Sequence, residues 1–144
     1  MFYFAYGANT NIDGMAYRCP DAERVGTLAL PDYRLVFRGV ADIEPRKGSA
    51  VQGVLWDITD ECERSLDRFE GYPNHYTKEY FAVSVDGCPF TAMFYTMQRK
   101  TFAPPSYSYR ETIRQGYKDN CLPLSYLLAA IDDSEMLDKS IFHK

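Results

Sequence analysis

The spacing of hydrophobic and polar residues predicts strands in the first part of the chain and longer helices towards its end. Residues 1–6 form an aromatic-rich apolar run that stops at Gly7, which indicates a buried first strand. Asn9 or Asn11 is placed to cap a short helix that runs through about Arg18. The first part of the chain is therefore expected to be strand, turn and helix.

Three apolar segments follow that have the length of strands. Residues 25–30 and 33–37 predict two strands, with Pro31 and Asp32 as the turn between them. Residues 51–58 alternate between two faces and predict another strand.

The segment between these strands is polar. Residues 39–49 contain Pro45 and Gly48, so we expect a surface loop that borders any pocket nearby. Asp42 and Glu44 lie in this segment and could reach a pocket, although we expect them to be solvated carboxylates at the surface.

A helix is predicted to begin at Thr59 or Asp60, because Asp60 and Glu63 have the spacing of a capping box. Gly71 is expected to end it. One apolar stripe is formed by Cys62, Leu66 and Phe69. Four acidic residues of this predicted helix are expected to be solvated: Asp60, Glu61, Glu63 and Asp67.

The second half of the chain predicts a hairpin and then two helices. Residues 80–85 and 90–97 flank an Asp-Gly pair, which is a strong hairpin signal. Ser108 with Glu111 predicts a helix start, and Pro123 predicts the first turn of another helix. Strands first and longer helices late indicate an α+β fold in which short twisted strands curl towards a barrel. No repeat or linker interrupts residues 1–144, so we expect one domain.

Composition and charge exclude several functions. The net charge of −4 and the absence of a basic stripe argue against nucleic acid as a partner. No apolar run approaches 18 residues and no basic leader opens the sequence, so no membrane partner and a cytoplasmic location are expected.

The cysteines and histidines indicate no metal site. Four widely spaced cysteines form no CxxC motif, and His75 and His143 add only two further soft ligands. We expect the cysteines to be reduced and packed as small hydrophobic side chains: Cys19, Cys62, Cys88 and Cys121. Neither histidine lies in a recognisable nucleophile motif, and no phosphate-binding loop is present.

Glu70 is a candidate general base. It is the last residue before the helix-ending Gly71, where a carboxylate faces the negative end of the helix dipole. It also lies beside the apolar stripe, so partial burial and the dipole should both raise its pKa. The alternative is that Arg68 or Lys78 neutralises it.

The turn formed by Tyr6, Gly7, Ala8 and Asn9 is a candidate anion-binding site. Successive amides beside a helix N-terminus can cradle a carboxylate or a developing oxyanion, and Gly7 allows close approach of a ligand. The alternative is an ordinary turn from a strand into a helix.

Taken in order, these segments resemble the γ-glutamyl cyclotransferase family, including its AIG2-like and γ-glutamylamine branches. The resemblance runs from about residue 2 to 131. It rests on FAYGAN at 4–9, VGTL at 25–28, YRLVF at 33–37, VQGVLWDI at 51–58, LDRFEG at 66–71 with Tyr76 after it, and the late residues Pro104, Pro105, Ser106, Tyr109, Ile113, Gly116, Leu122, Pro123 and Tyr126.

The resemblance implies a small mixed β-barrel flanked by short helices and an enzyme that closes a γ-glutamyl group to 5-oxoproline. Glu70 would be the catalytic residue, and Tyr6, Gly7, Ala8 and Asn9 would bind substrate. Tyr76 and Tyr95 would lie at the pocket margin as hydroxyl donors or as core residues. The reaction needs no cofactor and no metal, and the partner would be a small γ-glutamyl molecule bound by a monomer or homodimer.

Ala8 departs from the family loop, which has serine at this position. The loss of a hydroxyl leaves two alternatives open. The chain could act on a γ-glutamylamine, an isopeptide or an acyl-carrier-linked substrate, or it could be a binding module without turnover on the same fold.

Overall fold

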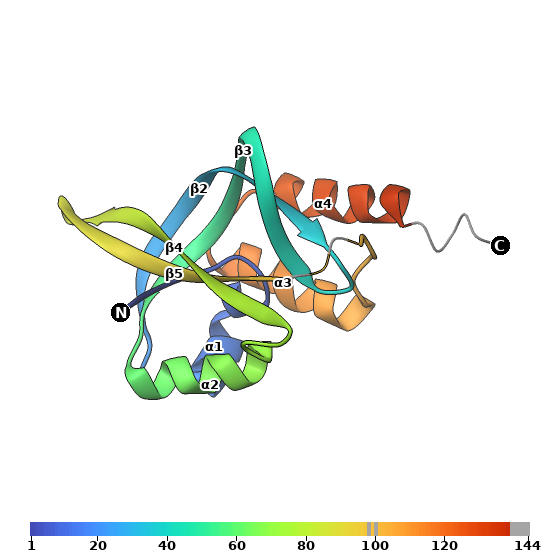
Figure 1. The fold of residues 1–144 in the computed structure, drawn as a ribbon. Coiled ribbons are helices and arrows are strands. Elements are labelled where there is room, and N and C mark those ends of the chain that lie inside the picture. Colours follow the sequence, from blue (N-terminus) through green and yellow to red (C-terminus); the bar gives the residue numbers. More distant parts are fainter. Residues whose placement is uncertain (98, 100, 139–144) are drawn as a thin grey trace.

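A five-stranded mixed sheet organises the molecule (Figure 1). The computed structural model describes residues 1–97, 99 and 101–138. In chain order the elements are β1 (Phe2–Ala5), the 3-10 turn η1 (Ala8–Thr10), α1 (Ile12–Arg18), β2 (Glu23–Phe37), β3 (Ala41–Asp57), α2 (Asp60–Glu70), β4 (Tyr76–Val85), β5 (Cys88–Met97), α3 (Tyr107–Asp119) and α4 (Leu124–Leu137).

The first strand lies in the centre of the sheet. The strand order is β2-β3-β1-β5-β4, and β1 is antiparallel to β3 and parallel to β5. The predicted mixed α+β fold is confirmed, and the sheet is curled. In the described residues β2 and β4 are the two ends of this order, so the curled sheet is not a closed barrel.

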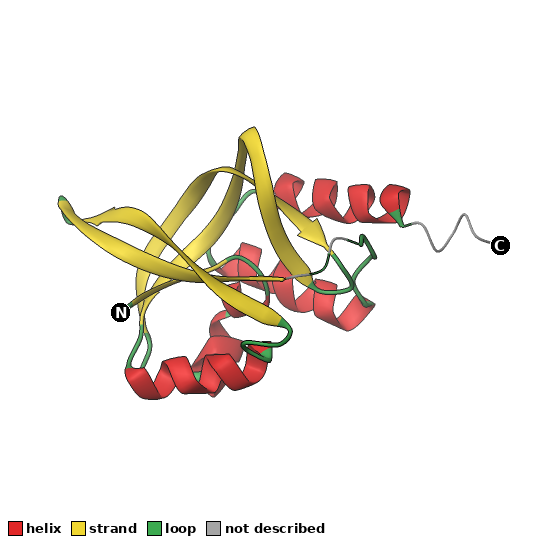
Figure 2. Cartoon of the chain, in the orientation of Figure 1, coloured by secondary structure: helices red, strands yellow, loops and turns green. Residues whose placement is uncertain are grey.

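Both faces of β1 are covered, which is why its sequence is apolar without interruption. Phe4 and Tyr6 belong to a core that includes residues of β2, β3, α3 and α4. Tyr3 and Ala5 point to the other face, into a core shared with α1 and α2. Figure 2 shows that α1 and α2 lie together on one side and α4 on another. Two cores therefore meet at the strand that leads into the Gly7 turn.

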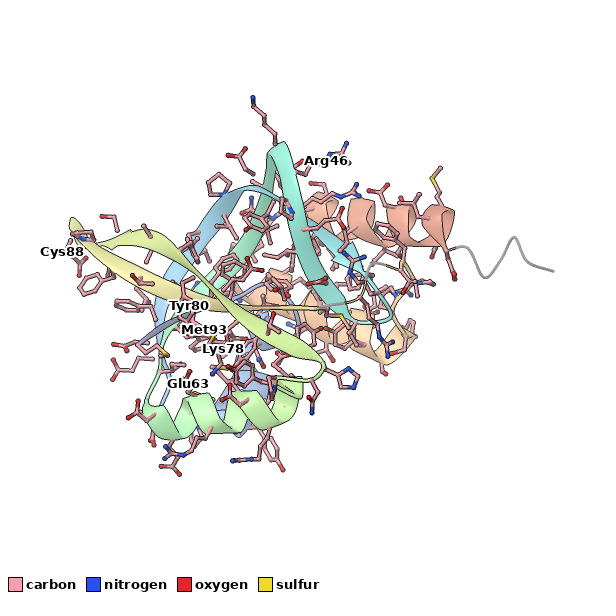
Figure 3. All side chains as sticks on the ribbon, viewed as in Figure 1. Arg46, Glu63, Lys78, Tyr80, Cys88 and Met93 are labelled. Atoms are coloured by element: carbon pink, nitrogen blue, oxygen red, sulfur yellow. A yellow bond between two sulfur atoms is a disulfide. The ribbon has the colours of Figure 1, made fainter. Side chains whose placement is uncertain are left out.

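The long hairpin of β2 and β3 differs from the sequence prediction at two places. β2 runs through Pro31 as one strand with a register shift, so no turn separates the two predicted strands. Most of the predicted loop 39–49 is strand, because β3 begins at Ala41 and pairs with β2 through Pro45. The hairpin bends where Asp32 has a φ of 62° and Gly48 a φ of 87°, and Arg46 marks this bend in Figure 3.

The helix starts are set by side-chain caps. Asn11 accepts a hydrogen bond from the backbone of Gly14 and begins α1, as expected. Thr59, rather than Asp60, caps α2 by accepting from Cys62 N. Ser106 caps α3 by accepting from Tyr109 N, so this helix begins two residues earlier than the Ser108–Glu111 spacing predicted.

The hairpin of β4 and β5 has the predicted turn. Asp86 and Gly87 both have positive φ angles, 52° and 79°, which the right-handed twist of a hairpin favours. Cys88 lies at this tip (Figure 3).

The prediction of reduced, packed cysteines is wrong for both pairs: one pair is oxidised and the other is exposed. Cys19 and Cys62 form a disulfide that joins the end of α1 to the first turn of α2, with their Cα atoms 5.1 Å apart. The two cysteines are 43 positions apart in the sequence, so the sequence does not indicate that they are close. Their proximity depends on the packing of α1 against α2. Cys88 and Cys121 are free and exposed rather than packed in a core. His143 lies outside the described residues.

Candidate active site

A cavity of about 120 Å³ lies where the turn after β1, the connection between β2 and β3, the end of α2 and the start of α3 meet. It brings together all seven residues that the sequence singled out. The lining residues are Tyr3, Phe4, Tyr6, Gly7, Ala8, Asn9, Val40, Ala41, Phe69, Glu70, Tyr76, Tyr95 and Tyr109.

The turn after β1 lines this cavity and has backbone donors without a partner among the described residues. Thr10 N and Asn11 N bond back to the carbonyl groups of Gly7 and Ala8, and this closes the 3-10 turn. In the described part of the chain, the preceding N–H groups of residues 7–9 donate no backbone hydrogen bond. A Cβ on Gly7 would lie 3.0 Å from Ala41 Cβ, so glycine permits the close approach of the opposite wall. These amides are available for a negatively charged ligand group.

Glu70 ends α2, and Gly71 follows in the left-handed conformation with a φ of 67°. The side chain is partly exposed, and among the described residues it has no hydrogen-bond or ion-pair partner. Burial raises the pKa of Glu70 to about 7, and the positive charge of Arg18 opposes part of this shift. A carboxyl group with this pKa can both accept and return a proton near neutral pH.

Lys78 does not neutralise Glu70. Its Nζ atom lies 2.8 Å from Glu63 and 2.9 Å from Asp67. Lys78 therefore joins β4 to the turns of α2 that come before Glu70 (Figure 3). Glu63 and Asp67 are therefore paired rather than solvated, which corrects the sequence expectation. Arg68 forms no ion pair with Glu70 either.

Arg18 is the cation that sequence analysis missed. Its guanidinium group lies 4.0 Å from the centre of the Phe69 ring, and its Nε donates to Asn9 Oδ1 at 2.7 Å. Phe69 is 46% exposed, so it leaves the predicted apolar stripe and forms a platform for Arg18 at the pocket. The feature of the sequence that could have indicated Arg18 is its place at the end of α1, the helix that follows the turn at residues 6–9.

Three pocket tyrosines direct their hydroxyl hydrogens to the protein. Tyr6 donates to the carbonyl of Tyr95 at 2.6 Å, and Tyr76 donates to the carbonyl of Ala41 at 2.6 Å. Tyr95 donates to Asp67 Oδ1 at 2.7 Å. Tyr76 and Tyr95 thus line the pocket, but their hydroxyl hydrogens are used to hold its walls together.

Two other tyrosines have the opposite arrangement. Tyr3 accepts from Asn9 Nδ2 at 3.0 Å, and Tyr109 accepts from Ala41 N at 3.1 Å. Neither hydroxyl group donates to a described residue. Burial raises the pKa of Tyr3 far above its usual range and that of Tyr109 to about 12, so both stay protonated. They are potential donors that sequence analysis had assigned only to a strand and a helix.

The connection between β2 and β3 is anchored by a buried ion pair. Arg38 donates to Asp42 Oδ2 at 2.7 Å and to Glu44 at 2.8 Å, and Asp42 Oδ1 accepts from Met97 N at 2.9 Å. Asp42 and Glu44 are therefore structural partners of Arg38, not solvated loop carboxylates. Only the residues next to this pair, Val40 and Ala41, reach the cavity.

Comparison with known proteins identifies the family. A family model described as γ-glutamyl cyclotransferase, AIG2-like, matches residues 3–117. The chain belongs to this family. It is 31% identical to a γ-glutamylcyclotransferase of Homo sapiens, over 95% of this chain and 81% of that protein. It is also 31% identical to one of Bos taurus, over 86% of this chain and 73% of that protein.

A solved structure named γ-glutamyl cyclotransferase has the same fold. It superimposes with a TM-score of 0.77 at 28% identity, and the match covers 96% of this chain and 88% of that one. The part of the sequence matched by the cyclotransferase model includes every lining residue of the cavity. Within the described residues, no helix has the length and apolar character needed to cross a membrane.

Proposed function

We propose that this chain is a γ-glutamyl cyclotransferase that converts a γ-glutamyl compound to 5-oxoproline and a free amine. The observation that carries the proposal is Glu70, a carboxyl group with a pKa of about 7 that has no partner among the described residues. It lines the same cavity as the turn at residues 7–9, whose amides donate no backbone hydrogen bond there. The family relationship supports the same reaction. We also propose that residues 1–144 act as one domain, since the cavity uses residues from Tyr3 to Tyr109.

The reaction is an intramolecular aminolysis in which Glu70 carries protons, one at a time, from the attacking nitrogen to the departing nitrogen. The carboxylate accepts a proton from the substrate α-ammonium group, and the free amine attacks the γ-carbonyl carbon. The new C–N bond closes the five-membered ring, and the bond to the departing nitrogen breaks. Glu70 returns its proton to that nitrogen as the bond breaks. It then takes the second proton from the ring nitrogen and passes it to the released amine, which leaves as an ammonium ion, so the lactam is neutral and the Glu70 carboxylate is restored. Because nucleophile and electrophile share one molecule, holding their orientation supplies much of the acceleration.

The turn amides of residues 7–9 bind the negative charge of the substrate in this proposal. A carboxylate or oxyanion would receive preorganised hydrogen bonds without any movement of the backbone. Tyr6, Tyr76 and Tyr95 hold the walls around it through the hydroxyl bonds to backbone and Asp67. The small cavity suits one γ-glutamyl group, with the departing amine extending towards the exposed Phe69.

The test measures 5-oxoproline after incubating the pure protein with γ-glutamyl-alanine, glutathione or γ-glutamyl-ε-lysine. Product from at least one substrate is expected, and the preferred one identifies the departing amine. Glu70→Gln should lower kcat by about 10²–10⁴-fold, the usual contribution of a general acid–base group. Glu61→Gln, an exposed change on the same helix, should leave activity unchanged. A Glu70→Gln variant with most of the wild-type activity would overturn the mechanism.

A non-catalytic binding module is the second candidate, and Ala8 is the observation that favours it. Alanine removes a hydroxyl group from the cradle but keeps its backbone amides. Binding of a γ-glutamyl compound without 5-oxoproline release from any of the three substrates would select this function.

A further inference from the structure

We propose that the Tyr3 hydroxyl group donates a hydrogen bond to the substrate γ-carbonyl oxygen, and that Arg18 and Asn9 fix it in the donating orientation. Tyr3 would touch the reacting atoms, while Asn9 and Arg18 are positioning residues. The inference rests on the proposed function, because it assigns a partner to the oxygen that becomes negative during ring closure.

Arg18 determines which way the Asn9 carboxamide faces. A guanidinium group has only donors, so the atom of Asn9 that meets Arg18 Nε at 2.7 Å must be the oxygen. Asn9 is 2% exposed, and its main-chain oxygen is held by Trp56 Nε1 at 3.1 Å. The carboxamide is thereby fixed, with its NH₂ group directed at Tyr3.

Asn9 in turn determines the direction of the Tyr3 hydroxyl. The NH₂ group is a donor, so the Tyr3 oxygen accepts its bond at 3.0 Å and uses one lone pair. The hydroxyl hydrogen must then point away from Asn9. No described residue accepts it, although Tyr3 is 3% exposed. A buried hydroxyl hydrogen without an acceptor in the protein is suited to a ligand oxygen.

The position of Tyr3 indicates which ligand oxygen this is. Tyr3 lines the same cavity as Glu70, and the negative charge of Glu70 adds to burial in raising the pKa of Tyr3. Glu70 must reach both the attacking and the departing nitrogen, and both are bonded to the γ-carbon in the tetrahedral intermediate. The oxygen on that carbon is therefore the substrate acceptor close to Tyr3. Since burial keeps Tyr3 neutral, it stabilises the oxyanion as a donor and does not compete with Glu70 for protons.

Tyr3→Phe tests the donor directly. It should lower kcat by about 10²–10³-fold, as loss of one oxyanion donor does, with a much smaller change in KM. The matched control is Tyr117→Phe, because Tyr117 is also buried, lies outside the cavity and has a hydroxyl group without a partner among the described residues. This control should keep wild-type kinetics. A Tyr3→Phe variant that retains its kcat overturns the proposal.

Asn9→Asp tests the orientation without changing the shape of the side chain or removing the backbone amide. A carboxylate still pairs with Arg18, but it accepts from Tyr3 and turns the hydroxyl hydrogen away from the cavity. The kcat of Asn9→Asp, measured at a pH well above the pKa of Glu70, should fall as far as that of Tyr3→Phe. The double variant Tyr3→Phe/Asn9→Asp should be no slower than Tyr3→Phe alone, because Tyr3→Phe has already removed the hydroxyl donor. If the losses in kcat of the two single variants add up in the double variant, Asn9 acts independently of Tyr3. That result would overturn the proposal that Asn9 orients the Tyr3 hydroxyl group.

Wild-type turnover separates this inference from the proposed function. If wild type forms 5-oxoproline and Tyr3→Phe is as fast, only the Tyr3 inference fails. If wild type forms none, the proposed function fails, and calorimetric binding of 5-oxoproline tests Tyr3 instead. Weaker binding by Tyr3→Phe than by Tyr117→Phe would still support a ligand-facing donor, while equal binding would overturn it.

Discussion

The Tyr95 hydroxyl group donates a 2.7 Å hydrogen bond to Oδ1 of Asp67, which lies one helical turn before Glu70. This bond ties β5 to the end of α2, and Lys78 reinforces it from β4. The position of the candidate catalytic carboxylate therefore depends on a tyrosine whose hydroxyl hydrogen is bonded to α2 itself.

Tyr95→Phe should loosen the end of α2. A hydrogen bond to a charged group contributes about 1.5–3 kcal/mol, and the remaining pairing of Asp67 with Lys78 should limit the loss to the lower part of that range. We expect lower stability in urea unfolding together with a several-fold drop in kcat. Tyr80→Phe, on an exposed position of β4, is the control that should change neither. Unchanged stability in Tyr95→Phe would contradict the role given to this bond.

Glu70 should make the protein less stable as the pH rises. Its pKa is raised from 4.5 to about 7 on folding, so the folded state binds more protons than the unfolded state between these values. The free energy of unfolding should fall across that window by up to about 3 kcal/mol, less for the part of the side chain that solvent reaches. Glu70→Gln should remove this fall and be the more stable protein at pH 8. Urea unfolding of both proteins at pH 4.5 and 8 measures the effect, and parallel behaviour would refute it.

Gly116 lets α3 pack directly on the candidate binding turn. A Cβ at this position would collide with Thr10 Oγ1 and with the backbone of residues 10 and 11. Gly116→Ala should therefore displace η1, lower stability by about 1–3 kcal/mol and weaken 5-oxoproline binding. Gly26→Ala is the control, because a Cβ there meets nothing within 4 Å. Calorimetry of both variants shows whether the turn needs this contact.

The Cys19–Cys62 disulfide should stabilise the packing of α1 on α2. Closing a loop of this length typically contributes about 2–4 kcal/mol by restricting the unfolded chain. Dithiothreitol should therefore lower the urea midpoint of wild type. It should have no such effect on Cys19→Ser/Cys62→Ser, while Cys88→Ser should respond as wild type does. An identical midpoint with and without reductant would count against the bond.

Ala8→Ser restores the hydroxyl group expected from the family loop. Ala8 lines the cavity and is 9% exposed, so a serine hydroxyl would face the ligand rather than bulk solvent. One neutral hydrogen bond is worth about 0.5–1.5 kcal/mol, which predicts roughly two- to twelve-fold tighter binding of 5-oxoproline. Unchanged or weaker binding would show that the backbone amides alone set affinity.

Local signals predicted much of the fold, and long-range contacts explain what they missed. The Asp86–Gly87 turn and the Gly71 helix end depend on conformations set within a few residues, so the sequence was sufficient. Residues 39–49 were predicted as loop because Pro45 and Gly48 usually interrupt strands, whereas pairing with β2 carries the strand through them.

In the candidate site too, local features were predicted from the sequence and features that depend on long-range contacts were missed. Glu70 was found because its helix end is a local feature. Arg18 and the Tyr3 hydroxyl were missed because their roles depend on Asn9, which lies between them only after the turn has folded. The direction of a hydroxyl hydrogen is invisible in sequence, since each tyrosine has the same donor and acceptor groups.

The central position of β1 has a consequence for how the protein is made. Residues 2 and 3 pair with residues 92 and 93, so β1 is synthesised well before the strand that it pairs with in parallel. Contacts so distant in sequence slow folding and leave an apolar strand exposed meanwhile. Fragments that stop before β5 should therefore engage chaperones or aggregate, and the catalytic machinery should appear only late in synthesis.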